Sequence, residues 1–220
     1  MTYKEFAKSA MEYAVKKNCD SCELYYANGE SFEVNANGGE IDRYSVSREA
    51  GVSVRVSVDG HEGYAYTEAI GEPETLVDHA IDNALCMESA DEHPMQTRQN
   101  YQSILREDSA LKSMSESERI ALAKRLEALC LAADPRVKRV VYCSAEYSAG
   151  GVIMENSLGL YAEKSGNGSV IYAMPSVQEG EEVQTGFAFR MGREAADAEG
   201  CAREAVEDAL GKLGGKPVDS

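Results

Sequence analysis

Positively charged residues are scarce in this sequence. The 220 residues include 22 Lys and Arg against 38 Asp and Glu, which gives a formal net charge of −16. A field of this sign repels phosphate backbones and anionic lipid surfaces, and no cluster of Lys and Arg reverses it locally. We therefore expect no direct contact with nucleic acid or with a membrane, and we interpret most of the acidic side chains as a well-hydrated surface.

Long apolar runs are also missing. No stretch approaches the roughly 20 residues needed to span a bilayer, and the amino-terminal segment predicts an amphipathic helix rather than a signal peptide. These absences predict a cytoplasmic protein. In that compartment the six cysteines are expected to be reduced thiols, and four of them lie singly in apolar segments as predicted core residues: Cys86, Cys130, Cys143 and Cys201.

The motifs of catalytic sites are incomplete. His61-Glu62 begins like a zinc-protease motif, which needs a second histidine one helical turn later, but Ala65 stands there. The pair also lies in a predicted strand, so we interpret His61 as a solvated strand residue. No serine lies in a G-x-S-x-G elbow, and no carboxylates stand out as an acid–base pair. We predict neither a catalytic nor a metal-binding residue in this chain.

Cys19 and Cys22 have the C-x-x-C spacing of redox centres and of half a zinc site. A zinc site needs a second pair of ligands, and a thioredoxin-like site needs the cysteines to follow a strand and open a helix. Here they follow a predicted helix, open a predicted strand, and have no second pair at a suitable distance. We favour two small residues at a helix–strand junction, and a redox or metal role stays open as the alternative.

Local signals predict helices at several places. Thr2 with Glu5, and Ser115 with Glu118, have the spacing of a capping box, and Pro73 is well suited to the first position of another helix. A further helix is predicted near the carboxyl end.

Blocks of strands are predicted between these helices. Val52, Val54 and Val56 alternate with polar residues, which indicates one buried and one wet face. Glycine-containing turn signals separate the strands, at Asn28-Gly29, Asn37-Gly38-Gly39, Asp59-Gly60, Ala149-Gly150-Gly151 and Gly166-Asn167-Gly168.

The order of these elements predicts the fold class. Helices flank consecutive strands instead of alternating with single ones, so we predict an α+β fold with antiparallel β-sheets flanked by helices. The order also suggests two similar helix-strands-helix units, 1–90 and 112–214, joined by a long polar connection at 90–111 that is mobile or wraps across a partner.

Several segments follow one another in an order typical of a known family: Cys19-Asp20-Ser21-Cys22-Glu23-Leu24-Tyr25, Gly39-Glu40-Ile41, Glu49-Ala50-Gly51-Val52-Ser53-Val54-Arg55-Val56, Glu155-Asn156-Ser157-Leu158-Gly159-Leu160 and Gln184-Thr185-Gly186. Each is a scaffold motif, and their shared order covers nearly the whole chain. In this order the sequence resembles the TldD/PmbA family. The short middle part and the helix before Asp134 are similar to the PmbA (TldE) branch.

The resemblance implies that residues 1–220 form the amino-terminal domain of a protein about twice this length, with the carboxyl-terminal domain absent. It implies a cytoplasmic hydrolase system for proteolysis and peptide maturation, in a family that also carries the label modulator of DNA gyrase. The implied partners are an unfolded peptide and a TldD-like or identical subunit, with which the chain forms a dimer. No cofactor is expected in this chain, and zinc is expected only in a TldD-like partner or in the missing domain.

Two functions follow as hypotheses. The first is a non-catalytic amino-terminal domain of a PmbA/TldD-type metallopeptidase system, which contributes to dimer assembly and to access of unfolded peptides. The alternative is a self-sufficient cytoplasmic binding or adaptor protein without enzymatic activity. Four residues are candidates for contact with substrate or an interface, each with a structural role as its alternative: Arg55, on the polar side of the best-defined strand, and Asn156, Gly159 and Gln184, in the family-like segments.

Overall fold

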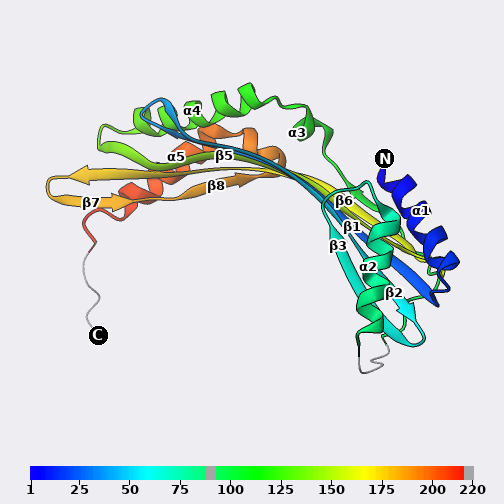
Figure 1. Ribbon diagram of the computed structural model, residues 1–220. Helices are drawn as coiled ribbons and strands as arrows, with labels where there is room; N and C mark the ends of the chain where they lie inside the picture. The colour runs from blue at the N-terminus through cyan, green and yellow to red at the C-terminus, as the bar shows by residue number, and fades with distance from the viewer. Residues whose placement is uncertain (88–92, 216–220) are drawn as a thin grey trace. The chain divides into compact units, whose positions relative to one another are not determined.

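The structure, a computed structural model, describes residues 1–87 and 93–215 (Figure 1). Eight strands of this described part form one sheet in the order β3-β2-β1-β5-β6-β4, and β7 and β8 also pair with β6. The strands are β1 (Ser21–Asn37), β2 (Glu40–Val58), β3 (His61–Thr67), β4 (Ile104–Arg106), β5 (Val137–Asn156), β6 (Tyr161–Glu179), β7 (Glu182–Thr185) and β8 (Ala188–Met191). The pairs β2–β3, β6–β7 and β6–β8 are antiparallel, whereas β4 runs parallel to β6.

Helices flank these strands, which confirms the predicted α+β class. They are α1 (Tyr3–Lys16), α2 (Pro73–Leu85), α3 (Ser109–Ser113), α4 (Glu116–Ala133) and α5 (Ala198–Gly211), with a 3₁₀ helix η1 (Gly192–Ala196). Both predicted capping boxes are present. Glu5 N donates to Thr2 Oγ1 at 3.3 Å and Thr2 N to Glu5 Oε2 at 2.8 Å, and Ser115 and Glu118 repeat this exchange in α4. The boxes satisfy backbone N–H groups that have no partner within the helix, so the local sequence fixes both helix starts.

Contacts divide the chain into two compact units. Unit 1 comprises Met1–Gly29, Arg48–Arg106 and Gly150–Gly166, and unit 2 comprises Glu30–Ser47, Glu107–Ala149 and the chain from Asn167 onward. Neither unit is one continuous segment, because β1, β2, β5 and β6 each contribute one part to unit 1 and the other to unit 2. The division by contacts therefore differs from the predicted subunits 1–90 and 112–214.

In unit 1, α1 and α2 cover one face of the strands. Val52, Val54 and Val56 of β2 are fully buried against these helices, together with Phe6, Ala7, Ala10, Ala14, Cys22, Leu24, Leu76, Val77, Ala80 and Ala84. Because side chains alternate along a strand, the residues between the valines face the opposite side of the sheet. The register between β2 and β3 pairs Ser53 with Tyr66 on that opposite side.

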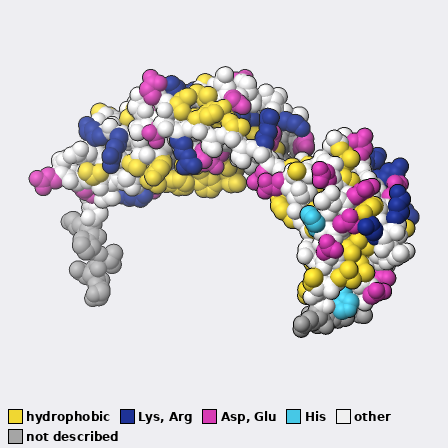
Figure 2. Space-filling view, viewed as in Figure 1, with side chains coloured by type: hydrophobic (Ala, Val, Ile, Leu, Met, Phe, Trp, Pro, Cys, Tyr) yellow, Lys and Arg dark blue, Asp and Glu magenta, His cyan; other side chains and the backbone are white. Residues whose placement is uncertain are grey.

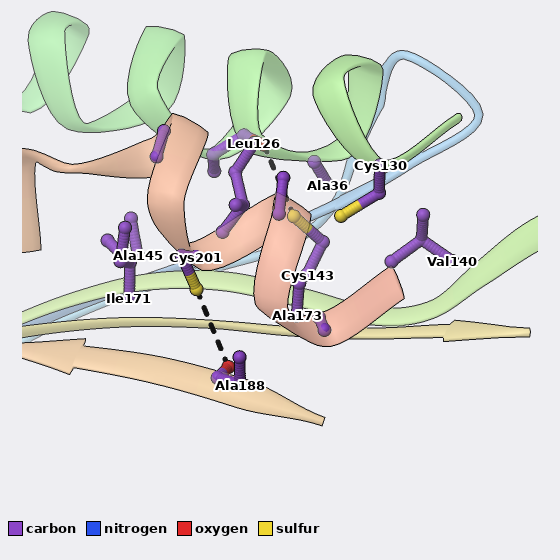
Figure 3. Packing of buried hydrophobic residues seen from close by; sticks show 14 of the residues in the cluster. Ala36, Leu126, Cys130, Val140, Cys143, Ala145, Ile171, Ala173, Ala188 and Cys201 are labelled. Carbon is purple, nitrogen blue, oxygen red and sulfur yellow. Dashed lines mark hydrogen bonds between the residues drawn. The ribbon is translucent and has the colours of Figure 1, made fainter. Parts of the chain in front are cut away.

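In unit 2, α4 and α5 cover one face of the strands. Leu126 of α4 and Cys201 of α5 belong to one buried cluster with Ala145 of β5 and Ile171 of β6, and the Cys201 side chain points toward Ala188 (Figure 3). Three predicted core cysteines, Cys130, Cys143 and Cys201, are fully buried there. Burial raises the pKa of Cys130 to about 12, so this thiol stays protonated and packs as a small apolar side chain.

The prediction for Cys86 is wrong, because this cysteine is exposed. It follows the last residue of α2 as its C-cap. It therefore lies beyond the apolar stripe that faces the core.

Some predicted turns are continuous strand. Asn28-Gly29 lies inside β1, Gly150-Gly151 inside β5, and Gly166-Asn167-Gly168 inside β6. A Cβ placed on Gly150 would lie 2.7 Å from Asn28 O, and one on Gly151 would lie 3.1 Å from Lys164 O. These two glycines thus permit a close approach of neighbouring strand backbones instead of a change of direction.

Two other turn signals are confirmed. Gly38 and Gly39 join β1 to β2 with φ values of +64° and +81°, and Asp59-Gly60 joins β2 to β3 with φ values of +50° and +78°. Such left-handed conformations favour glycine at hairpin turns.

The connection predicted at 90–111 contains regular structure, and its first residues lie outside the described part of the chain. β4 and the start of α3 fall within it, and Met95 is buried. β4 pairs with Lys164 to Gly166 of β6. From residue 93 onward, the segment therefore contacts its own chain at Met95 and at β4, and the contact with a partner stays a prediction. No helix within 1–87 and 93–215 has the length and apolar character required to cross a bilayer.

Candidate functional site

Arg55 is the centre of an ion-pair cluster in unit 1. It faces away from the helices because it lies between the buried Val54 and Val56 on β2. One guanidinium nitrogen lies 2.8 Å from Glu23 Oε1, and the other lies 3.5 Å from Glu62 Oε2 and donates to His93 O at 3.2 Å. Three separate segments thus converge on one arginine.

Asn156 extends this cluster from β5. Its Nδ2 donates to Glu23 Oε2 at 3.3 Å and to Gln96 O at 2.8 Å, and its Oδ1 accepts the N–H groups of Leu158 and Leu160, both at 3.0 Å. The side chain is buried and uses both its donor and its acceptor. Two of the four candidate residues, Arg55 and Asn156, therefore belong to one network through Glu23.

This network links the segment that begins at residue 93 to β2 and β5, all within unit 1. Arg55 binds the carbonyl oxygen of His93, Asn156 binds that of Gln96, and Met95 between them is buried. These hydrogen bonds hold the backbone on both sides of the buried Met95. The contacts give Arg55 and Asn156 a structural role, and their contact with a substrate or a partner subunit stays a prediction.

The electrostatics of Arg55 fit this structural role. Burial by itself would lower the pKa of Arg55, but the hydrogen bond with Tyr64 and the negative charges of Glu23 and Glu62 outweigh it and raise the pKa. The guanidinium group is therefore held in its charged form by two carboxylates. Its Nε is buried without a hydrogen-bond partner among the described residues.

The other two candidates lie outside this cluster. Gly159 has a φ of +88° in the turn between β5 and β6, and the side chain of Arg98 would lie 3.5 Å from a Cβ placed there. Gln184 belongs to unit 2, on β7, where its Nε2 donates to Glu182 Oε1 at 3.0 Å. The geometry gives both residues local structural roles, and their proposed contacts with substrate remain predictions.

The structure also shows the surroundings of His61 and Cys22, which belong to the incomplete zinc-protease and C-x-x-C motifs. His61 begins β3 as predicted, half-buried, with Nδ1 lacking a hydrogen-bond partner among the described residues. Cys22 is buried at the start of β1, and burial raises its pKa to about 12. A thiolate is the nucleophilic and metal-binding form of cysteine, so a protonated Cys22 gives no support to a redox role.

Sequence reasoning missed a cavity on the same side of unit 1 as Arg55. It measures about 200 Å³, and nine residues of β1, β2, β3 and the chain next to them line it: Tyr25, Ala27, Asn28, Glu49, Ala50, Gly51, Ser53, Tyr66 and Glu68. Strand alternation places Ser53 opposite the valines and therefore gives part of this signal. Which residues of β1 and β3 lie beside Ser53 depends on strand pairing, which the sequence alone does not specify.

These features define an antiparallel α+β scaffold that carries an ion-pair network on its strands. Residues 22–84 match the family model described as PmbA/TldA metallopeptidase domain 1, and residues 109–213 match the one described as PmbA/TldA metallopeptidase central domain. The two matches together cover most of the chain. The chain belongs to the PmbA/TldD family.

Solved structures agree with this fold. A candidate modulator of a DNA gyrase from Thermotoga maritima has a TM-score of 0.88 at 21% identity, over 99% of this chain and 50% of that chain. TldE from Thermococcus kodakarensis has a TM-score of 0.80 at 18% identity, over 93% of this chain and 47% of that chain. A candidate modulator of DNA gyrase from Bacteroides thetaiotaomicron has a TM-score of 0.73 at 23% identity, over 98% and 51%. The chain thus spans about half the length of these structures, and a comparison with curated proteins gives no match.

The family description implies a metal ion. Within 1–87 and 93–215, no group of three His, Cys, Asp or Glu side chains is arranged so as to hold a metal ion. A protein zinc site needs three or four such ligands. The described residues therefore do not fit a metal site of this kind.

Proposed function

We propose that this chain is a non-catalytic part of a PmbA/TldD-type peptidase system and that it contributes to subunit assembly and to access of unfolded peptides. The observation that carries the proposal is the exposure of large side chains on the strand faces opposite the helices. In unit 1 these are Tyr25, Tyr64 and Tyr66, and in unit 2 they are Phe187, Phe189 and Met191. Groups of large exposed apolar side chains are typical of surfaces that bind other proteins or peptides.

The unit 2 surface supports a role in assembly. Phe189 and Met191 lie on β8, on either side of Arg190, and are 50% and 59% exposed. The rings of Phe187 and Phe189 are 6.1 Å apart, and Tyr172 of β6 lies 6.1 Å from Phe187. In Figure 2, hydrophobic side chains gather where Figure 1 places β8, on the side away from α4. Aromatic side chains and methionine are enriched at protein interfaces.

The remaining parts of the proposal follow from the family. The zinc ion is held by a TldD-like partner or by a further domain, the system works in the cytoplasm, and the partner is a TldD-like or an identical subunit. The acidic character of the chain supports the view that any link to DNA gyrase is indirect, because a net charge of −16 opposes binding to DNA.

Peptidase assays test the non-catalytic part. The purified chain is incubated with reduced, carboxymethylated casein, alone and after co-purification with a TldD-like subunit, with and without a chelator. We expect no hydrolysis by the chain alone and chelator-sensitive hydrolysis by the pair. Chelator-sensitive hydrolysis by the 220-residue chain alone would overturn the proposal.

Size-exclusion chromatography tests the assembly part. Phe189→Glu places a charge in the unit 2 surface and is expected to weaken association with the TldD-like or identical subunit at least tenfold, because an unpaired charge is costly to bury. Leu131→Glu is the matched control, since Leu131 is also exposed but lies on α4. Peptide binding without association with either subunit would instead favour the adaptor alternative.

A further inference from the structure

The cavity on unit 1 has an aromatic floor. Tyr66 of β3 lies across Gly51 of β2: a Cβ placed on Gly51 would lie 2.3 Å from Tyr66 Oη and 2.7 Å from Cζ and Cε2. The tyrosine can therefore rest against the β2 backbone only because residue 51 has no side chain. Tyr66 remains 63% exposed, so much of its surface is open to the cavity and to solvent.

A second ring and two carboxylates complete the cavity. Tyr25 of β1 lines the cavity, together with Glu49 of β2 and Glu68, which follows β3. Tyr66 Oη donates to Glu68 Oε1 at 3.4 Å. Among the nine described residues that line the cavity, none is basic. The cavity therefore combines π faces with negative charge.

The pKa of Tyr66 reflects the negative charge around its phenol group. Desolvation raises the pKa of Tyr66, and the charges of Glu68 and Glu49 raise it further. Each of these carboxylates thus acts on Tyr66, which places the negative field at the ring itself.

We propose that this cavity binds a cationic group of an unfolded peptide, either a Lys or Arg side chain or the free terminal amine. The inference rests on the proposed function and specifies which peptides are preferred. Ammonium and guanidinium groups are attracted to the faces of tyrosine rings, and the nearby carboxylates add a favourable charge interaction. A volume of about 200 Å³ is below the roughly 300–1,000 Å³ of sites for drug-sized ligands, so it suits one side chain or one terminus of a longer peptide.

The competing explanation is diffuse attraction, because any cation is drawn to a chain with a net charge of −16. The two differ in location. Diffuse attraction spreads over all acidic surfaces and is screened by salt, whereas the cavity binds the cation next to Gly51 and Tyr66.

Nuclear magnetic resonance of the full nitrogen-15-labelled chain separates these explanations. Four unstructured peptides of the same Gly-Ser background are titrated at physiological ionic strength: one with a central lysine and blocked ends, one with norleucine in its place, one with glutamate, and one with norleucine and a free terminal amine. We expect amide shifts centred on Gly51, Ser53 and Tyr66 with the lysine peptide and none with norleucine or glutamate at blocked ends. Amide shifts with the free-amine peptide would show that the cavity also accepts a peptide terminus, whereas their absence would restrict it to side chains. Shifts spread over remote acidic surfaces, or equal shifts with norleucine, would overturn the proposal.

Variants locate the site. Tyr66→Leu removes the π face and is expected to weaken binding about two- to fivefold, the range of an exposed cation–π contact, whereas Tyr66→Phe keeps the ring and most of the affinity. Gly51→Ala is expected to displace the ring and reduce binding to a similar extent. Glu68→Gln removes one of the two charges and is expected to weaken binding as well.

Controls with matched chemistry lie elsewhere on the chain. Tyr142→Leu removes a tyrosine of similar exposure from β5, and Glu181→Gln removes an exposed carboxylate, so neither is expected to change affinity. Equal losses in both sets would reject the cavity as the site. Because binding is measured on the chain alone, loss of subunit assembly leaves this test intact, and a failed titration leaves the assembly surface of unit 2 unaffected.

Discussion

In unit 1 and in unit 2, a glycine lies directly against a helix: Gly63 on β3, and Gly186 in the connection between β7 and β8. In unit 1, a Cβ on Gly63 would lie 2.0 Å from Ala80 O and 2.3 Å from Ala84 N of α2. In unit 2, a Cβ on Gly186 would lie 2.0 Å from Ala205 O and 2.4 Å from Ala209 N, both in α5. Both units therefore use a glycine and small helix residues to bring two backbones into contact.

The residue after each glycine is bound in a related way. Asn83 Nδ2 of α2 donates to Tyr64 O at 2.7 Å, whereas Phe187 N donates to Asp208 Oδ2 of α5 at 2.9 Å. In both units the helix side chain bonds the backbone of the residue after the glycine. The helix side chain donates in unit 1 and accepts in unit 2. The two units thus share this contact between a helix and a glycine-containing segment, and the predicted similarity of 1–90 and 112–214 stays a prediction.

The opposite faces of the two units differ more. Unit 1 carries exposed tyrosines with the acidic cavity, and unit 2 carries Phe187, Phe189 and Met191. The two units thus share the glycine–helix contact but differ in the side chains exposed where neither pair of helices packs. The glycine–helix contact stabilises each unit, whereas the proposed roles differ between the two exposed faces.

The largest effect is expected from removing the shared contact. Gly63→Ala or Gly186→Ala places a methyl group against helix backbone, which cannot yield as a flexible side chain does. We expect each to lower the free energy of unfolding by about 3 kcal/mol, the upper part of the range for overpacking. Urea unfolding followed by circular dichroism measures the loss.

The matched control is Gly168→Ala, because a Cβ on this strand glycine meets nothing within 4 Å and its φ is not positive. It is expected to be neutral or to stabilise by up to about 1 kcal/mol through the unfolded chain. If only one of Gly63→Ala and Gly186→Ala destabilises the chain, the two contacts are not equivalent.

A smaller effect is expected from the acid that binds a hairpin turn in each unit. In unit 2 the buried Glu127 accepts Gly38 N at 2.6 Å and Gly39 N at 2.9 Å, whereas in unit 1 Asp20 accepts Gly60 N at only 3.5 Å. Glu127→Ala is expected to cost about 1.5–3 kcal/mol, since hydrogen bonds to charged groups are strong. Asp20→Ala, at an exposed site, is expected to cost less than about 0.5 kcal/mol.

Unfolding midpoints in urea measure both variants. Glu127→Gln keeps one acceptor oxygen and should lose about half as much as Glu127→Ala. Equal costs for Asp20→Ala and Glu127→Ala would show that burial and distance do not distinguish the two turns.

The helix starts and two hairpins were predictable because their signals are local. Thr2 and Glu5 lie within one turn of α1, and Gly38 and Gly60 carry the left-handed backbone of their turns. The turn predicted at Asn28-Gly29 was wrong because Asn28 packs against Gly150 of a distant strand. A glycine needed for close packing has the same local signature as one needed for a turn.

The site was predictable only in part. Alternation placed Arg55 on the uncovered face, and Asn156 came from the family-like segments, but their link through Glu23 depends on how β1 lies between β2 and β5. The cavity at Tyr66 was missed for the same reason. Side chains that meet across strands are specified by pairing, and the sequence contains no local signal for it.

The smallest expected effect is a pH dependence of the free energy of unfolding, which Asp208 contributes and Asn83 does not. The hydrogen bond from Lys212 and that from Phe187 N lower the pKa of Asp208 in the folded chain. Between this lowered pKa and the ordinary value near 4, the unfolded chain binds more protons, so stability rises with pH there. The contribution is complete above about pH 4 and is lost as pH falls through the lowered pKa. Asn83 has no charge to titrate.

Urea unfolding between about pH 2.5 and 6 tests this difference. The stability gap between the native chain and Asp208→Asn should narrow as pH falls below about 4, by a small amount because the carboxylate is largely accessible to solvent. The gap between the native chain and Asn83→Ala should stay constant across the same range, since neither side chain ionises. A pH-independent gap for Asp208→Asn would mean that unit 2 gains nothing from the charge that replaces the amide of unit 1, so the exchange of donor and acceptor would be a change of geometry alone.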